Sequence, residues 1–166
     1  MKKISRPKFL ATLTGLSSMF IFKPLTMAQT QQSKRPDPLS AQLVQEFVRL
    51  GHFDLAGVKE KLAETPSLLN ATTDWGAGDF ETALGGASHM GRKDIADFLI
   101  RSGARMDIFT AAMLGKLDLV QSMCDSFPEL LQSKGPHGIT LLMHAQKGGD
   151  DSKLVIEYLN QKGITK

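Results

Sequence analysis

The chain has 166 residues, of which 42% are hydrophobic and 22% are charged. This length suits one domain with a single elongated core, which excludes a second large domain. Because Cys124 is the only cysteine, the chain cannot form a disulfide within itself.

The first 28 residues have the layout of an export signal. Four basic side chains between Lys2 and Lys8 precede a mostly apolar segment, Phe9–Phe22, and small residues lead up to Ala28. As a helix this segment would be about 21 Å long, shorter than the roughly 30 Å of bilayer hydrocarbon. We therefore expect a signal peptide over 1–28 that is cleaved after Ala28, giving a periplasmic or secreted protein without stable membrane insertion. An uncleaved membrane anchor is the alternative.

Cleavage after Ala28 would change the balance of charge. The removed segment holds five of the 20 basic side chains and none of the 17 acidic ones, which leaves 15 basic against 17 acidic groups and a net charge of −2. Binding to a nucleic-acid backbone needs clustered Lys and Arg, so no nucleic-acid partner is expected. Residues 29–38 are polar and contain two prolines, so we expect a disordered tether there and a folded domain over 39–166.

The folded domain begins with a short helical unit and a long connection. Gly51 and His52 form a predicted turn after the first helix, and Val58 lies on the apolar stripe of the next one. His52 is interpreted as a turn residue only. The connection Asn70–Glu81 is the longest irregular stretch and is expected to form a finger-like hairpin. Its tryptophan, Trp75, is the only one in the chain. Trp75 either packs with Phe80 across the finger and seals the end of the first unit, or is exposed for recognition.

The stretch Thr82–Arg105 is the clearest unit of a repeat. Small and apolar residues at its start suit a closely packed helix, which Gly91 is expected to end. A second helix follows, with one buried stripe made of Ile95, Phe98 and Leu99. Such a pair of helices cannot bury both of its faces alone, so it should stack on further units.

The same pattern recurs along the chain. Gly115 stands four residues before Leu119, as Gly91 stands four before Ile95. Successive turn glycines are separated by 40, 24 and 34 residues, and these glycines are Gly51, Gly91, Gly115 and Gly149. The first unit is therefore expected to carry an insertion, and the second to have lost its long hairpin.

These residues resemble the ankyrin repeat, a unit of about 33 residues with a T-P-L-H-x-A opening, a Gly-His turn and an L-L-x-x-G-A ending. Thr82–Ala87 and Thr140–Ala145 are similar to the opening but lack its Pro and His, Leu99–Ala104 is similar to the ending, and Gly51-His52 to the turn. The resemblance covers about Leu39–Gly163. It implies an all-α, ankyrin-like solenoid of three to four helix pairs with hairpin or finger connections, used as an interaction scaffold. The chain also resembles bacterial exported ankyrin proteins that have no defined activity.

The sequence does not predict an enzyme or a cofactor. Ser88 and His89 are adjacent, but the residues around them lack the second glycine of a nucleophile elbow, and no strand is expected before them. Neighbouring residues of a helix point about 100° apart, so these two side chains should not face each other. Cys124 is expected in the core, because it lies beside Met123 on the second helix of the third unit. The adjacent Asp125 disfavours the thiolate that a reactive cysteine needs.

We expect a non-enzymatic module that binds a protein or peptide on a concave face formed by the finger and the first helix of each unit. The residues assigned to this face combine aromatic, basic and soft apolar chemistry; they are Trp75, Phe80, Glu81, His89, Met90, Arg92, His137, His144 and Lys147. The alternative is that histidines bind a metal or small ligand, which would make the protein an accessory factor for an envelope enzyme. A metal needs at least three of Glu81, His89, His137 and His144 within a few ångströms of one point, whereas a peptide suits residues spread along the face.

Overall fold

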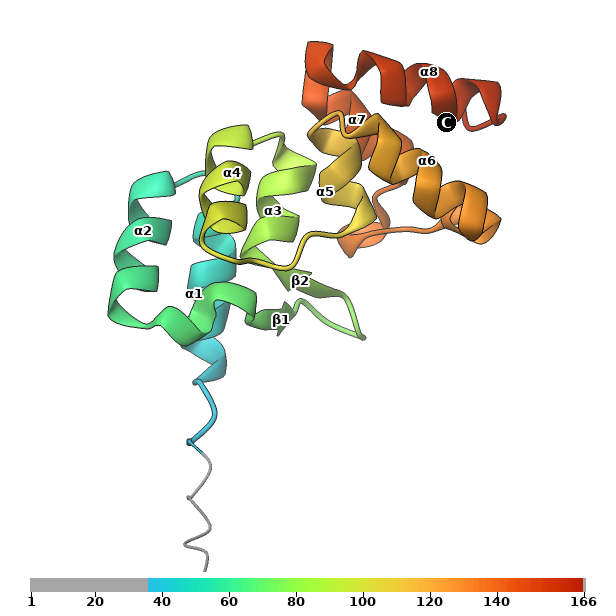
Figure 1. Ribbon diagram of the computed structural model, residues 1–166. Coiled ribbons are helices and arrows are strands. Elements are labelled where there is room, and N and C mark those ends of the chain that lie inside the picture. Colours follow the sequence, from blue (N-terminus) through green and yellow to red (C-terminus); the bar gives the residue numbers. More distant parts are fainter. Residues whose placement is uncertain (1–35, 166) are drawn as a thin grey trace, which may run out of the picture. The chain divides into compact units, whose positions relative to one another are not determined.

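The computed structural model describes residues 36–165, and they form a mostly helical domain with one small two-stranded hairpin (Figure 1). The α-helices are α1 (Ala41–Gly51), α2 (Leu55–Glu64), α3 (Ala83–Met90), α4 (Lys93–Arg101), α5 (Ile108–Met113), α6 (Leu117–Ser126), α7 (Leu141–Gly148) and α8 (Lys153–Gln161). The strands are β1 (Thr72–Asp74) and β2 (Phe80–Thr82), and short 3-10 helices occur in connections: η1 (Pro66–Asn70), η2 (Pro128–Gln132), η3 (Pro136–Gly138) and η4 (Gly149–Ser152). The predicted signal peptide and residues 29–35 of the predicted tether lie outside the described residues. Within residues 36–165, no helix has both the length and the apolar character needed to cross a membrane.

The helices pack as consecutive pairs. α1 contacts α2, α3 contacts α4, α5 contacts α6, and α7 contacts α8, so the pairs follow one another along the chain (Figure 1). The first helices of the pairs also contact one another in series, from α1 through α3 and α5 to α7. In addition α3 contacts α7 directly, past α5, which has only six residues. This contact departs from a repeat stack in which each unit touches only its immediate neighbours.

Threonine side chains cap the N-termini of two helices, α3 and α7. The hydroxyl of Thr82 accepts a hydrogen bond from the backbone N–H of Gly85 at 3.0 Å, and Thr140 does the same for Met143 at 3.3 Å. These bonds satisfy backbone donors that have no partner inside the first turn of a helix. The two threonines that opened the predicted repeats are therefore the N-caps of α3 and α7.

Two of the predicted turn glycines have different structural roles. Gly91 follows α3 with a φ of 72°, in the left-handed region, which confirms the predicted helix stop. Gly51 instead is the last residue of α1, and a Cβ atom there would lie 2.7 Å from the Cα atom of Ala83. Because it has no side chain, Gly51 allows α1 and α3 to approach each other closely.

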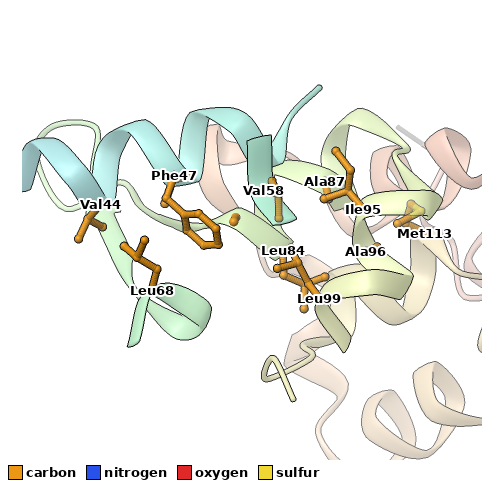
Figure 2. Packing of buried hydrophobic residues seen from close by; sticks show 12 residues of the cluster. Val44, Phe47, Val58, Leu68, Leu84, Ala87, Ile95, Ala96, Leu99 and Met113 are labelled. Atoms are coloured by element: carbon orange, nitrogen blue, oxygen red, sulfur yellow. The ribbon is translucent and has the colours of Figure 1, made fainter. Parts of the chain in front are cut away.

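The buried apolar residues form two clusters. The first lies mainly among α1 to α4 and the second among α5 to α8. In the first cluster Ile95 and Leu99 of α4 are fully buried, with Leu99 beside Leu84 of α3 and Ile95 beside Ala87 (Figure 2). Phe98 is half-buried against the cluster. The predicted stripe of α4 is confirmed.

The matching helix of the next pair turns a different face inward. Leu119 of α6 corresponds to Ile95 of α4 in the repeat, yet its side chain is 46% exposed. Val120 and Cys124 are buried in its place, so the inward face of α6 is shifted by one residue. The prediction that Cys124 is a core residue is confirmed.

The predicted finger is the β1–β2 hairpin. The two strands are antiparallel, with Thr73 opposite Glu81. Trp75 is half-buried and packs against the first cluster, so it belongs to the packing of the first unit. Phe80 is 61% exposed and takes no part in that packing.

A second finger is missing between α4 and α5, where residues 102–107 contain no strand. This agrees with the short spacing between Gly91 and Gly115. The connection 133–140, which precedes α7, reaches the β1–β2 hairpin, and His137 hydrogen-bonds to Asp79. The chain thereby brings together residues 58 positions apart.

Candidate functional site

Four side chains from three parts of the chain meet beneath the hairpin. They are His52 at the end of α1, Glu81 on β2, His89 on α3 and His137 in the connection 133–140. Each offers one donor atom, and these atoms all lie within 4.8 Å of one another. We call this group the His–Glu cluster.

Glu81 lies at the centre of the cluster, and its side chain is fully buried. Successive residues of a strand point to opposite faces, so β2 turns Glu81 inward while Phe80 and Thr82 point away. The indole N–H of Trp75 donates to Glu81 Oε2 at 2.7 Å. Burial alone would raise the pKa of the carboxyl group, but contacts with His52, His89 and Trp75 outweigh it and hold the pKa at about 2. Glu81 is therefore a buried carboxylate.

His52 is fixed from two sides. Its Nδ1 atom lies 3.0 Å from the carbonyl oxygen of Val48, one helical turn back, which leaves Nε2 pointing at Glu81 Oε2, 3.3 Å away. The Glu81 carboxylate raises the pKa of His52 against the opposing effect of burial. Space for the ring comes from Gly86 of α3, where a Cβ atom would lie 2.7 Å from the imidazole.

His137 is held by Asp79 in a conformation that is uncommon for a residue with a side chain. Its φ and ψ are 58° and 19°, in the left-handed region. The Asp79 carboxylate accepts one hydrogen bond from the backbone N–H of His137 at 2.8 Å and pairs with its Nδ1 atom at 2.7 Å. This double contact aims Nε2 at Glu81 Oε2, 3.5 Å away. Strained backbone of this kind is concentrated at functional sites.

His89 completes the cluster from the side of α3. Its Nδ1 atom lies 3.1 Å from Glu81 Oε1, but the two atoms do not meet at hydrogen-bonding angles, and both are buried without a hydrogen-bond partner. The ring packs edge-to-face on His52 and on His137, with centroid distances of 4.8 and 5.3 Å. Two buried polar atoms thus face each other at ion-pair distance without forming a hydrogen bond.

The residues predicted for the concave face divide into three groups by burial. Phe80, Met90, His137 and Lys147 are exposed; Trp75 and Arg92 are half-buried; and Glu81, His89 and His144 are buried. Three of the four residues considered for a metal converge, namely Glu81, His89 and His137. His144 does not join them: its Nδ1 atom lies 2.9 Å from the carbonyl oxygen of Thr140, and burial lowers its pKa.

Sequence reasoning did not assign His52 or Asp79 to the site. His52 was expected to serve the turn, and Asp79 lies in an irregular loop. The sequence signal for His52 is Gly86, a glycine inside a helix where no turn requires one; it leaves space for the His52 ring.

Ser88 holds the packed position predicted for it, with its hydroxyl bonded to the Leu84 carbonyl oxygen and to Thr110.

A groove lies beside the cluster, between the hairpin and the connection 133–140. It has a volume of about 320 Å³. Phe80, Phe109 and Pro136 give it apolar walls, and Asp107 and Lys134 contribute charges of opposite sign. This groove is open to solvent, whereas Glu81 and His89 lie beneath the surface.

No protein-family model, curated protein or solved structure matches the chain. The geometry of the cluster and of the groove is therefore the basis for assigning a function.

Proposed function

We propose that this chain is a non-enzymatic binding module, an ankyrin-like stack of helix pairs that holds a protein or peptide partner in the cell envelope. The pairing of α1 with α2 through α7 with α8, and the serial contacts of the first helices, support this architecture. The ankyrin-like opening, turn and ending in the sequence support it as well. Stacks of this kind present one elongated binding surface.

The single observation that carries the proposal is the exposure of Phe80. This residue is 61% exposed, on the face of β2 opposite to the buried Glu81. Phe80 forms one wall of the groove, and Lys134 and Asp107 lie in the same groove. Aromatic side chains at such positions often carry much of the energy of a protein interface. The groove suits a peptide segment with an apolar side chain next to polar or charged groups.

The partner surface is smaller than the sequence predicts. Glu81, His89 and His144 are buried, so they are not available for direct contact. Phe80, Met90, His137 and Lys147 remain, with the half-buried Trp75 and Arg92 and the groove residues. Arg92 already bonds to Asp94 and to the carbonyl oxygen of Phe53, so Phe80 is the better residue to test.

The test places a photo-reactive benzoylphenylalanine at position 80 and, as a control, at position 127. Phe127 is exposed to a similar degree, 65% against 61%, but lies at the end of α6, outside the groove. After irradiation in an envelope extract, position 80 should give a discrete cross-linked species, identified by mass spectrometry, that position 127 does not give.

Competition with unlabelled protein gives the energetic part of the test. Wild type and Phe127→Asp should suppress the cross-link, whereas Phe80→Asp should need a concentration about tenfold higher or more, as expected when an interface aromatic is lost. Equal suppression by Phe80→Asp and Phe127→Asp would exclude the groove as the binding surface.

A further inference from the structure

We propose that His52, Glu81, His89 and His137 bind one zinc ion. This inference goes beyond partner binding and does not depend on it, because Glu81 and His89 are too buried to touch a partner. Only His137 belongs both to the cluster and to the exposed surface. It rests on the hydrogen bonds that orient the rings, on the distances between donor atoms, and on two buried polar atoms that have no partner.

The outer hydrogen bonds assign the protons of two rings. A carbonyl and a carboxylate only accept hydrogen bonds, so the Nδ1 atoms of His52 and His137 carry the hydrogen. In the neutral rings the lone pair is then on Nε2. Both Nε2 atoms face Glu81 Oε2, at 3.3 and 3.5 Å. Lone pairs that face a carboxylate oxygen repel it unless the ring gains a proton or a cation lies between them.

A cation satisfies this arrangement better than protonated rings do. The ring of His89 lies 4.8 Å from that of His52 and 5.3 Å from that of His137, so three imidazolium groups would repel one another at short range. One divalent ion can instead accept a lone pair from each neutral ring. Its charge also balances the two carboxylates of the region, Glu81 and Asp79.

The distances to the carboxylate fit a tetrahedral ion. Zinc bound at 2.0–2.1 Å to nitrogen and oxygen has donor atoms about 3.3 Å apart along each edge of the tetrahedron. The nitrogens of His52 and His137 lie 3.3 and 3.5 Å from Glu81 Oε2, and that of His89 lies 3.1 Å from the other carboxylate oxygen, Oε1. The widest separation between donor atoms in the group is 4.8 Å, so an ion would draw the rings inward by about an ångström.

The two polar atoms without a partner are the independent sign of a ligand. Glu81 Oε1 and His89 Nδ1 are buried, lie 3.1 Å apart and form no hydrogen bond. A buried polar atom without a partner is costly, and natural proteins rarely keep one without a reason. Both atoms are donors of the kind that zinc takes, and an ion between them would satisfy both.

The surroundings are those of a metal site. Histidine ligands of metals usually donate their other N–H to a carboxylate or to a backbone carbonyl. His137 has the first arrangement, with Asp79, and His52 has the second, with Val48. Three imidazoles and one carboxylate suit zinc, with copper(II) as the main competitor.

The cluster is also accessible to an ion. His52 and His137 retain 18% and 36% of their side-chain exposure. They line a shallow pocket together with Arg49, Phe53 and Trp75. A zinc ion can therefore reach the buried carboxylate without unfolding of the helices.

The experiment uses the full chain, purified without a histidine tag and treated with EDTA. Zn²⁺ is titrated by calorimetry and in competition with a chromophoric chelator, and Co²⁺ binding is followed by visible absorption. We expect one equivalent of Zn²⁺, displacement of Co²⁺ by Zn²⁺, and the strong visible bands of tetrahedral Co²⁺. Cu²⁺ is titrated in parallel; binding of Cu²⁺ without Zn²⁺ would overturn the assignment to zinc.

The variants separate ligands from other histidines. His137→Asn and Glu81→Gln should weaken zinc binding by about 100-fold or more, and Asp79→Asn by about 10- to 100-fold, because it loosens a ligand without removing it. The control is His144→Asn, the fourth histidine of the chain, which should stay within about threefold of wild type. Urea unfolding in EDTA checks that each variant folds, and zinc should raise the melting temperature of wild type but not that of His137→Asn.

Three outcomes would overturn the proposal. Wild type binds no stoichiometric zinc, His144→Asn loses as much affinity as His137→Asn, or Glu81→Gln binds like wild type. In the last case the cluster is a hydrogen-bond network, and zinc binds elsewhere.

Discussion

At the scale of single residues, the space around Gly51 and Gly85 determines how replacing each glycine changes the stability of the fold. Both lie in helices, where glycine is less favourable than alanine. A Cβ atom on Gly51 would lie 2.7 Å from the Cα atom of Ala83 and closer still to its carbonyl oxygen, whereas one on Gly85 meets nothing closer than 3.4 Å. The first contact is with backbone, which cannot move aside as a flexible side chain could.

Alanine substitutions at these two positions should therefore have opposite signs. Gly51→Ala should lower the free energy of unfolding by about 1–2 kcal/mol, since overpacking outweighs the gain in helix propensity. Gly85→Ala should raise it by about 0.5–1 kcal/mol. Urea unfolding followed by circular dichroism measures both. A stabilised Gly51→Ala variant would show that α1 and α3 are not in such close contact.

The residues of the His–Glu cluster could be predicted only in part. Glu81, His89 and His137 were recognised as chemically notable because histidines and a carboxylate fell on one expected face. His52 was not, because its orientation depends on a hydrogen bond within α1 and on the space left by Gly86. Neither dependence follows from repeat spacing.

At the scale of elements, α4 and α6 occupy equivalent places in the predicted repeat but bury different faces. Helical spacing correctly predicted that Ile95 and Leu99 of α4 are buried. The repeat offset could not predict the inward face of α6, because the register of a helix face is set by its neighbours, and α6 packs on α5, η2 and α8. The result is that Leu99 is fully buried while Leu119 is 46% exposed.

An aspartate substitution at each of these leucines tests this difference. Leu99→Asp should cost about 3–5 kcal/mol, because it leaves a charge without a partner in the first cluster. Leu119→Asp, the same substitution at an exposed leucine, is the control and should cost no more than about 1 kcal/mol. The free energies come from urea titrations. If Leu99→Asp kept the cooperative transition of wild type, the packing of α4 against α3 would have to be revised.

At the scale of the whole molecule, the absence of a hairpin between α4 and α5 affects how distant segments meet. Repeat spacing correctly indicated that the second unit has no long hairpin. The consequence could not be read from the sequence: without a second finger, the connection 133–140 reaches the first hairpin and carries His137 to Asp79. Contacts between residues 58 positions apart depend on how all the helix pairs pack together. Local sequence patterns do not specify that packing.

We also propose that the chain is exported from the cytoplasm. Residues 1–28 lie outside the described structure, and their composition predicts a signal peptide cleaved after Ala28. Protein recovered from an envelope or periplasmic fraction should therefore begin at Gln29, which intact mass spectrometry detects directly. Recovery of a mass that includes Met1, or of the protein in the cytoplasm alone, would contradict the prediction.

The hydrogen bond from Trp75 to Glu81 has a practical consequence. Because Trp75 is the only tryptophan of the chain, all of its indole fluorescence comes from a ring bonded to the central carboxylate of the cluster. The single tyrosine, Tyr158, lies on α8 and can be left unexcited at longer wavelengths. The natural protein thus carries its own optical probe, so the state of Glu81 can be followed in real time without a label.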